Sequence, residues 1–226
     1  MADTARKITM GFLPFGSDDE SVLFSEPLTS EPVDAGYNAV GNPVFDEGGV
    51  VFNDGTADGI YFDMSAMDTP VVAAELYKGC TVSFEIESGA LDDVFTTSDH
   101  VFSFGVASAS DSFSLRRRLE GYWDIDGQFA SRFHLSSVGK GAYTRVDLVF
   151  TAGKILAYFD RLFAGSTATD SGITSSALEE LNLGFKHLNI NGTTCIEGYK
   201  IKNLQLSNRI LSLPTHPEML NVLSFG

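Results

Sequence analysis

The sequence predicts an all-β protein, built as a two-sheet antiparallel jelly-roll sandwich with one short helix and extended terminal arms. Short runs that alternate apolar and polar residues recur about every 8–12 residues, which is typical of a sandwich or jelly roll. Clusters of Gly, Asp and Ser separate these runs and indicate turns between strands. The chain has 226 residues, 43% of them hydrophobic, which is enough for a single well-filled core.

The clearest strand is Thr81–Glu87, in which Val82, Phe84 and Ile86 alternate with polar residues. This pattern predicts a half-buried antiparallel strand with one face in water. Similar patterns predict four more strands, at His100–Ala107, Ser112–Leu119, Gly127–His134 and Tyr143–Thr151. The residues that we expect to form the core are Val82, Phe84, Ile86, Leu148, Phe150, Ile201 and Leu204.

Two further elements are shorter. Val50–Phe52 and Ile60–Phe62 flank a turn-rich connector, and we expect these two segments to pair with each other across it. A helix is expected over Ser175–Leu181, where a serine could cap the N-terminus and two glutamates suit the first turns.

The two ends of the chain differ from its middle. Residues 1–35 contain three prolines and show no steady period, and residues 213–226 contain two prolines before an apolar finish. The predicted organisation is therefore an N-terminal arm at 1–35, a sandwich at 36–212 and a tail at 213–226. Because such segments cannot offset the entropy of ordering with a core of their own, we expect at least one arm to pack on a neighbouring subunit.

Charge excludes one class of partner. The net charge is −15, with 30 acidic residues against 15 basic ones, whereas nucleic-acid binding needs a basic surface. Residues 1–115 hold 20 Asp and Glu and only three Lys and Arg, while residues 116–226 hold 10 acidic and 12 basic residues. This asymmetry indicates either a solvated acidic surface or an acidic face that meets a basic face on a neighbouring subunit.

The remaining compositional features concern compartment. Cys80 and Cys195 each lie in an apolar run without zinc-like spacing, so we expect buried free thiols. The N-terminus lacks the apolar segment of a secretory signal, and no apolar run approaches the about 20 residues of a membrane span. We therefore expect synthesis in a reducing cytoplasm and no membrane span.

Two segments carry a family resemblance. Leu148–Gly165 resembles the strand–turn–strand hairpin of the laminin-G-like, or concanavalin-A-like, jelly-roll superfamily. Gly198–Leu211 resembles its closing strand, and Thr81–Glu87 stands where the family has an early strand. The sequence departs from the family at Arg161, where a glycine is preferred, and at the pair before Leu204, which is acidic in the family. The resemblance implies the same fold that the alternation predicts.

The resemblance also raises the question of catalysis. Glycoside hydrolases of this fold place carboxylates in an E-x-D-x-x-E arrangement along one strand. Here Asp124 and Asp126 share a face, but the leading carboxylate, Glu120, stands four residues before Asp124 rather than two. Polysaccharide lyases of this fold need a Gln-x-His pair, and Gln128 and His134 are too far apart. We therefore predict that the protein has no catalytic residues and is not an enzyme.

A metal site is a second question, since some members of the superfamily hold calcium at a sheet rim. Asp54, Asp58 and Asp63 are oxygen donors close in sequence, with glycines that permit tight turns. Asp-Gly turns are equally common without metal. No cofactor is predicted, and calcium near Asp54 and Asp58 is left open.

The candidate ligand-binding residues surround the one basic concentration in the chain. They are Arg116, Arg118, Tyr122, Trp123, Arg132 and His134. Aromatic faces that stack on sugar rings, together with arginine donors, suit an acidic glycan. The alternative is structural, with Trp123 packed in the core or at its rim and the arginines paired with the acidic face.

Three functional classes follow. The first is a non-enzymatic structural or adhesion subunit of a larger assembly, a homo-oligomer that contacts other protein subunits. Bacteriophage proteins that resemble this fold suggest the concrete form, which is a virion protein of the capsid-decorating, fibre or tail kind, made in the host cytoplasm. The second class is a free lectin-like module that binds a cell-surface glycan. The third is a polysaccharide hydrolase or lyase.

Overall fold

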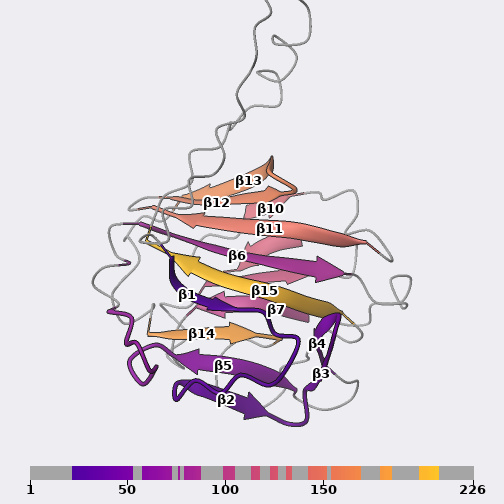
Figure 1. The fold of residues 1–226 in the computed structure, drawn as a ribbon. Helices are drawn as coiled ribbons and strands as arrows, with labels where there is room; N and C mark the ends of the chain where they lie inside the picture. The colour runs from indigo at the N-terminus through magenta and orange to yellow at the C-terminus, as the bar shows by residue number, and fades with distance from the viewer. Residues whose placement is uncertain are drawn as a thin grey trace, which may run out of the picture.

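The computed structural model describes residues 22–52, 58–72, 76, 79–87, 99–104, 113–117, 123–126, 131–133, 142–151, 154–168, 179–184 and 199–208. Its elements, β1 to β15, are all strands and form two antiparallel sheets that pack face to face (Figure 1). The prediction of an all-β, two-sheet antiparallel sandwich is therefore confirmed. Among the described residues, no helix has the length and hydropathy that crossing a membrane requires.

The larger sheet has eight strands, in the order β13-β12-β11-β6-β15-β4-β3, with β1 also paired to β15. Its strands are β1 (Val22–Glu26), β3 (Val44–Asp46), β4 (Gly49–Val51), β6 (Cys80–Glu87), β11 (Tyr143–Phe150), β12 (Lys154–Phe159), β13 (Leu162–Ala168) and β15 (Lys200–Ser207). Strand β6 is the centre of this sheet because it is hydrogen-bonded along its length to β11 on one side and to β15 on the other.

The smaller sheet has seven strands, in the order β10-β9-β8-β7-β14-β5-β2; in Figure 1 its β10 and β7 lie behind the larger sheet, and β14, β5 and β2 extend below it. Its strands are β2 (Tyr37–Val40), β5 (Gly59–Asp63), β7 (Asp99–Phe104), β8 (Phe113–Arg117), β9 (Trp123–Asp126), β10 (Ser131–Phe133) and β14 (Glu180–Leu183). Strand β14 joins its two halves, since it pairs with β7 on one side and β5 on the other.

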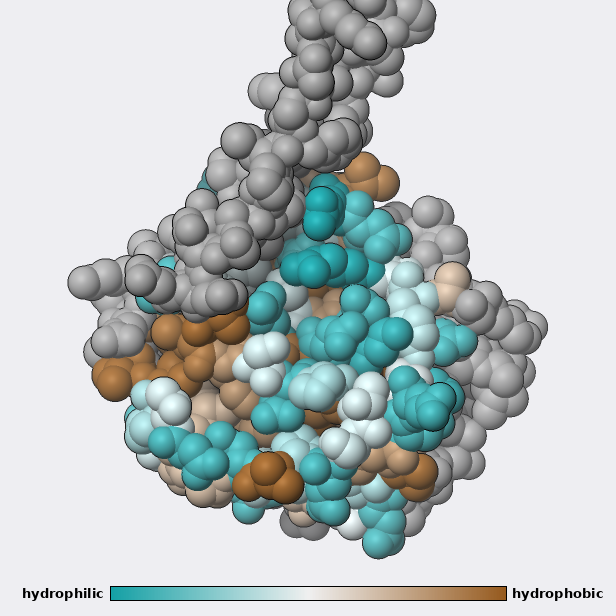
Figure 2. Space-filling model, viewed as in Figure 1, coloured by the Kyte–Doolittle hydropathy of each residue, from teal (hydrophilic) through white to brown (hydrophobic). Residues whose placement is uncertain are grey.

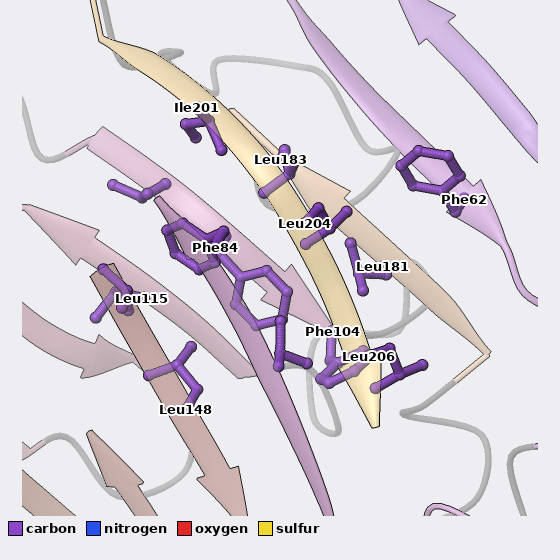
Figure 3. Packing of buried hydrophobic residues seen from close by; sticks show 14 of the residues in the cluster. Phe62, Phe84, Phe104, Leu115, Leu148, Leu181, Leu183, Ile201, Leu204 and Leu206 are labelled. Carbon is purple, nitrogen blue, oxygen red and sulfur yellow. The ribbon is translucent and has the colours of Figure 1, made fainter. Parts of the chain in front are cut away.

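The core lies between the two sheets and is rich in phenylalanine. All seven predicted core residues are at most 2% exposed: Val82, Phe84, Ile86, Leu148, Phe150, Ile201 and Leu204. Rings from both sheets follow one another across the interface, with centroids 5.9 Å apart for Phe84 and Phe102 and 5.1 Å apart for Phe104 and Phe150. Figure 3 shows these apolar side chains converging from β6 and β15 on one side and from β7 and β14 on the other.

One pairing prediction is wrong. Val50 lies in β4, which pairs with β15 and β3 in the larger sheet, whereas Ile60 and Phe62 lie in β5 of the smaller sheet. The turn-rich connector between them therefore links strands that belong to different sheets. Val50, Phe52, Ile60 and Phe62 are all fully buried, and an apolar run of this kind does not reveal which sheet it will join.

The predicted helix is also wrong where the structure describes it. Glu180 and Leu181 belong to strand β14, while residues 175–178 lie outside the described residues. Leu181 pairs with Phe62 of β5 and with Phe104 of β7, so two neighbouring strands bury it. This tertiary pairing overrides the weak local preference of a Leu-Glu-Glu-Leu stretch for helix.

The prediction of a strand over Gly127–His134 is confirmed for Ser131–Phe133. Strand β9 ends at Asp126, before the predicted start, and β10 occupies Ser131–Phe133. Strand β10 pairs with β9. Residues 127–130 and His134 lie outside the described residues.

The N-terminal boundary of the sandwich is earlier than predicted. Val22–Glu26 forms β1 on the edge of β15, and Phe24 and Leu28 are 9% and 0% exposed. The amide of Asn203 donates to the carbonyl of Pro27 at 3.0 Å, where β15 bulges between Lys202 and Gln205. Residues 22–35 therefore belong to the folded unit, because an apolar pair and an open sheet edge hold them. Residues 1–21 and 209–226 lie outside the described residues.

We predict that Phe84→Ala lowers the free energy of unfolding by about 3–5 kcal/mol, because it leaves a ring-sized cavity in the centre of β6. Urea denaturation measures this change. Val33→Ala is the matched control, since Val33 is 97% exposed and its truncation should shift stability by less than about 0.5 kcal/mol. A loss below about 1 kcal/mol in Phe84→Ala would contradict the packing described for β6.

Candidate functional site

The outer face of the larger sheet carries charges that pair with one another. The Lys200 ammonium lies 3.0 Å from Asp46, and the Lys202 ammonium lies 3.6 Å from Glu85. Lys202 also stands over the ring of Tyr143, with its nitrogen 3.6 Å from the ring centroid. Figure 2 shows hydrophilic residues over much of this face, with apolar patches between them and toward its edges. Because these cations already have partners in the sheet, the face contributes stability and solubility more readily than it offers a binding site.

An ion pair between a half-exposed arginine and a buried aspartate anchors the same face. Asp147 is 1% exposed, lies 2.9 Å from the Arg145 guanidinium and accepts a hydrogen bond of 2.6 Å from the Ser83 hydroxyl. These partners join β11 to β6, so the cluster is part of the sheet's framework. A buried carboxylate with two donors is satisfied and does not call for a ligand.

The smaller sheet has a different outer face, where a continuous row of polar residues crosses six strands. Paired positions run from β2 to β9 in the order Asn38, Tyr61, Asn182, Ser103, Ser114 and Asp126. Their chain neighbours Phe62, Leu181 and Phe104 are buried in the core. Since successive residues of a strand face opposite sides of the sheet, this polar row lies on the outer face.

The centre of the polar row is buried although it lies outside the core. Ser103 and Asn182 are 0% exposed, and Glu180, two residues before Asn182 and on the same face of β14, is 6% exposed. Tyr61 is only partly buried. Polar groups that are buried on the outer side of a sheet are costly to keep, so they indicate a function or a specific framework role.

The acidic end of this face is where β5 and β14 meet. Glu180 pairs in register with Asp63. Burial raises the pKa of Glu180 to about 7; a hydrogen bond from Asn182 opposes this shift and the charge of Asp63 adds to it. Burial and the charges of Glu180 and Asp63 also raise the pKa of Tyr61. One carboxyl oxygen of Glu180, Oε1, receives no hydrogen bond within the described part of the chain.

Asp63 has a second task at the end of β5. Its Oδ1 accepts hydrogen bonds from the Ser65 amide at 3.0 Å, the Ser65 hydroxyl at 2.7 Å and the Ala66 amide at 3.3 Å. This turn holds the carboxylate in place beside Glu180.

The basic end of the same face includes two of the residues predicted from sequence. Arg116 of β8 and Arg132 of β10 both pair in register with Asp124 of β9, and His100 of β7 pairs with Arg116. Arg116 stands two residues from Ser114, so these four positions form a second row on the outer face, beside the polar row. The structure thus brings the positions of Arg116 and Arg132 together, about 10 Å apart across one strand.

Trp123 does not belong to this row. It pairs in register with Arg117 and Phe133, and Arg117 stands two residues from Leu115, which is 1% exposed in the core. The position of Trp123 is therefore on the face opposite to Arg116 and Arg132. The backbone register thus gives Trp123 a different row from Arg116 and Arg132, and the joint ligand site stays a prediction. Arg118, Tyr122 and His134 lie outside the described residues.

The other candidates from the sequence have the following positions. Asp58 is 1% exposed and accepts a hydrogen bond from the Asn42 amide at 3.0 Å, while Asp54 lies outside the described residues. Within the described residues, no group of three or more His, Cys, Asp or Glu side chains could hold a metal ion. Calcium near Asp54 and Asp58 stays an open alternative.

The thiol prediction is confirmed for one of the two cysteines. Cys80 is fully buried as a free thiol, and burial raises its pKa to about 12, which makes it unreactive. Cys195 lies outside the described residues.

The sequence missed Glu180, Asn182 and Ser103. It assigned Glu180 to a helix, and only the pairing of β14 with β5 and β7 places these residues on one face. The alternation Glu-Leu-Asn-Leu was the available signal.

Solved structures resemble this fold at low sequence identity. No protein-family profile matches the chain, and no curated protein matches it in sequence. The structure is similar to Trypanosoma rangeli sialidase, with a TM-score of 0.65 and 14% identity over 85% of this chain and 31% of the sialidase chain. It is also similar to the binding domain of botulinum neurotoxin serotype D, with a TM-score of 0.64 and 13% identity over 92% of this chain and 52% of that one.

A third similar structure is the receptor binding domain of a botulinum neurotoxin C/D mosaic serotype, with a TM-score of 0.61 and 13% identity over 91% of this chain and 51% of that one. The chain thus spans about a third to a half of the length of these structures. The likeness supports a β-sandwich fold and, at this identity, nothing narrower.

We predict that the stability of the protein falls as pH rises from about 4.5 to about 7, by about 1–3 kcal/mol on account of Glu180. The folded state holds the Glu180 proton more tightly than the unfolded state, so deprotonation favours unfolding. Glu180→Gln should lose this component, and its unfolding free energy should exceed that of the wild type above pH about 7.

The matched control is Glu179→Gln, because Glu179 is the exposed neighbour in the chain. Urea titrations at several pH values compare the three proteins. Wild type and Glu180→Gln with parallel pH profiles would contradict the burial described for Glu180.

Proposed function

We propose that the chain is a non-enzymatic, glycan-binding adhesion domain whose ligand lies on the outer face of the smaller sheet. The observation that carries the proposal is the polar row from Asn38 to Asp126, together with the adjoining row that contains Arg116 and Arg132. Asn38 and Tyr61 are the partly exposed members of the polar row, while Ser103 and Asn182 are buried and support the surface from below. Hydroxyl, amide and phenol groups both donate and accept hydrogen bonds, as sugar hydroxyls do. Arginine at the edge of such a surface suits a carboxylate or sulfate substituent.

The comparisons support this proposal at the level of fold. The chain is similar to toxin domains that are named as binding and receptor binding domains, and to a sialidase of which it spans about a third. Because a sialidase is among the similar structures, glycan cleavage is the rival proposal for this chain. The register of β9 argues against cleavage, because a glycosidase needs a pair of carboxylates that face the same bond. Asp124 is paired with Arg116 and Arg132, and Asp126 is paired with Ser114, so neither has a carboxylate opposite it on a described neighbouring strand.

We predict that the purified chain binds a subset of a glycan array, and that Arg116→Gln combined with Arg132→Gln weakens the best acidic hit about tenfold or more, since each charge-assisted contact is worth about 1.5–3 kcal/mol. Isothermal titration calorimetry measures the change. Lys154→Gln is the matched control, because it removes a positive charge from an exposed position on the other sheet.

The same hits test catalysis. Incubation with wild type, and with Asp124→Asn combined with Asp126→Asn, should return each oligosaccharide uncut by mass spectrometry. An array without hits would overturn the binding proposal, and cleavage that the aspartate variant abolishes would establish the rival function.

More specifically, we propose that this laminin-G-like sandwich is a structural or adhesion subunit of a larger assembly. By analogy, the concrete form of this assembly is a virion. The uneven charge of the chain supports it, since residues 1–115 are strongly acidic and residues 116–226 slightly basic. Strand β1 is part of the sandwich, so residues 22–26 do not form a free arm. A terminal arm that packs on a neighbouring subunit would therefore come from residues 1–21 or 209–226.

We predict that the chain is oligomeric by light scattering at about 0.05 M salt and dissociates at about 1 M, where charge attraction is screened within about 3 Å. A chain without residues 1–20 keeps β1 and should remain folded while associating less. A full-length chain that is monomeric in both conditions would overturn the assembly assignment.

A further inference from the structure

The strand order gives the sandwich two distinct ends, each built from both sheets. Strands β10 and β13 are the last strands of their sheets at one end, where they contact each other. Strands β2 and β3 are the last strands at the other end, where the rings of Tyr37 and Phe45 lie 6.5 Å apart. Figure 1 shows the first end at the top and the second at the bottom.

The two ends differ in charge. Residues 22–52 and 58–72, which supply β1 to β5, contain eight Asp and Glu and no Lys, Arg or His. The described segments that supply β8 to β13 contain six Lys and Arg against four Asp, of which Asp147 is buried. The charge asymmetry of the sequence therefore becomes an asymmetry in space, with an acidic end at β2 and β3 and a weakly basic end at β10 and β13.

The turn between β12 and β13 presents a cation beside an apolar side chain at the basic end. Arg161 and Leu162 are both exposed, and Leu162 is 59% exposed. Asp160 and Arg161 have φ angles of 48° and 67°, in the left-handed region that favours glycine. The Arg145 amide donates to the Asp160 carboxylate at 2.9 Å, which ties the turn to β11. An arginine kept in a strained conformation at an exposed turn favours a role for its side chain.

A loop at the acidic end presents an apolar side chain among carboxylates. Val33 is 97% exposed. The Asp68 amide donates to the Asp34 carboxylate at 3.3 Å, and the Tyr37 hydroxyl donates to the Glu31 carboxylate at 3.3 Å. These bonds connect the loop to β2 and to the segment after β5, so Val33 is held in a fixed place beside three acidic residues.

We propose that copies of this chain associate head to tail, with the Arg161–Leu162 turn of one copy packed on the Val33 loop of the next. The inference rests on the proposed assembly and names the two surfaces that would form it. Leu162 and Val33 supply an apolar centre, and Arg161 meets the carboxylates around Val33. Both surfaces are held by hydrogen bonds within their own chain, which lowers the entropy cost of binding.

The contact is heterologous rather than symmetric. A two-fold contact between two acidic ends would bring like charges together, whereas an acidic end and a basic end attract each other. A heterologous contact leaves one unused surface on each terminal copy, so association continues until a ring closes or a filament forms.

Two double variants remove the two surfaces separately. Glu31→Lys with Asp68→Lys reverses the charge of the loop, and Arg161→Gly with Leu162→Ser removes the side chains of the turn. Sedimentation velocity at about 0.05 M salt should show that each variant associates about tenfold or more weakly than the wild type. The lysine variant is less negative than the wild type, so a change in general repulsion would strengthen its association rather than weaken it.

An equimolar mixture of the two variants tests the head-to-tail geometry. The intact turn of the lysine variant matches the intact loop of the glycine variant, whereas the two altered surfaces do not match each other. The mixture should therefore form a one-to-one dimer and nothing larger.

The control is Lys154→Glu, which reverses a charge on the same hairpin about 20 Å along the strand from the turn and should associate like the wild type. The melting temperature shows that each variant is folded. Arg161→Gly alone should weaken association without lowering the melting temperature, because glycine suits the positive φ.

Two results would overturn the head-to-tail contact while the wild type still forms a salt-sensitive oligomer. One is wild-type association in either double variant, and the other is a mixture that stays monomeric or grows beyond a dimer. The assembly assignment would then stand, with the terminal arms as the remaining contact. A wild type that is monomeric at both salt concentrations would overturn the assembly assignment and this inference together.

Discussion

The burial of one apolar face of each sheet is the constraint on which the rest of this structure depends. Strand β6 is paired on both sides, and its inward residues Val82, Phe84 and Ile86 are at most 1% exposed. A slip of one residue in any strand would turn its apolar set to the outside. The core therefore fixes the register, and the register in turn decides which residues are neighbours on each outer face.

The two outer faces differ in how their charged residues are arranged. On the larger sheet, cations meet acids across adjacent strands, as Lys202 meets Glu85 and Lys200 meets Asp46, so charges balance locally. On the smaller sheet, neutral polar residues occupy the centre, Glu180 and Asp63 form an acidic corner at one end, and the positions of Arg116 and Arg132 flank Asp124 at the other. Local pairing stabilises a surface, whereas separated charges leave a field that a ligand can complement.

Glu180 and Asn182 are the least expected part of this arrangement. Both are buried on the side of the sheet away from the core, although an apolar residue would satisfy burial at lower cost. The fold tolerates this cost because β14 is held at both edges, by β5 and β7. A strand anchored in this way can hold a carboxyl group whose proton is lost near pH 7.

The sequence by itself determined the fold class, the core and the clearest strands. Alternation in Thr81–Glu87 and Tyr143–Thr151 reports burial of one face directly, because it follows from the geometry of a single strand. The amino-acid sequence also showed that Arg116 and Arg132 are basic residues near each other in the chain. Tertiary structure alone decided that the positions of Arg116 and Arg132 both pair with Asp124, that Val50 and Phe62 lie in different sheets, and that Glu180 is in a strand opposite Asp63. These are contacts between segments distant in sequence, and their register is set by the summed packing of both sheets, which no local pattern encodes.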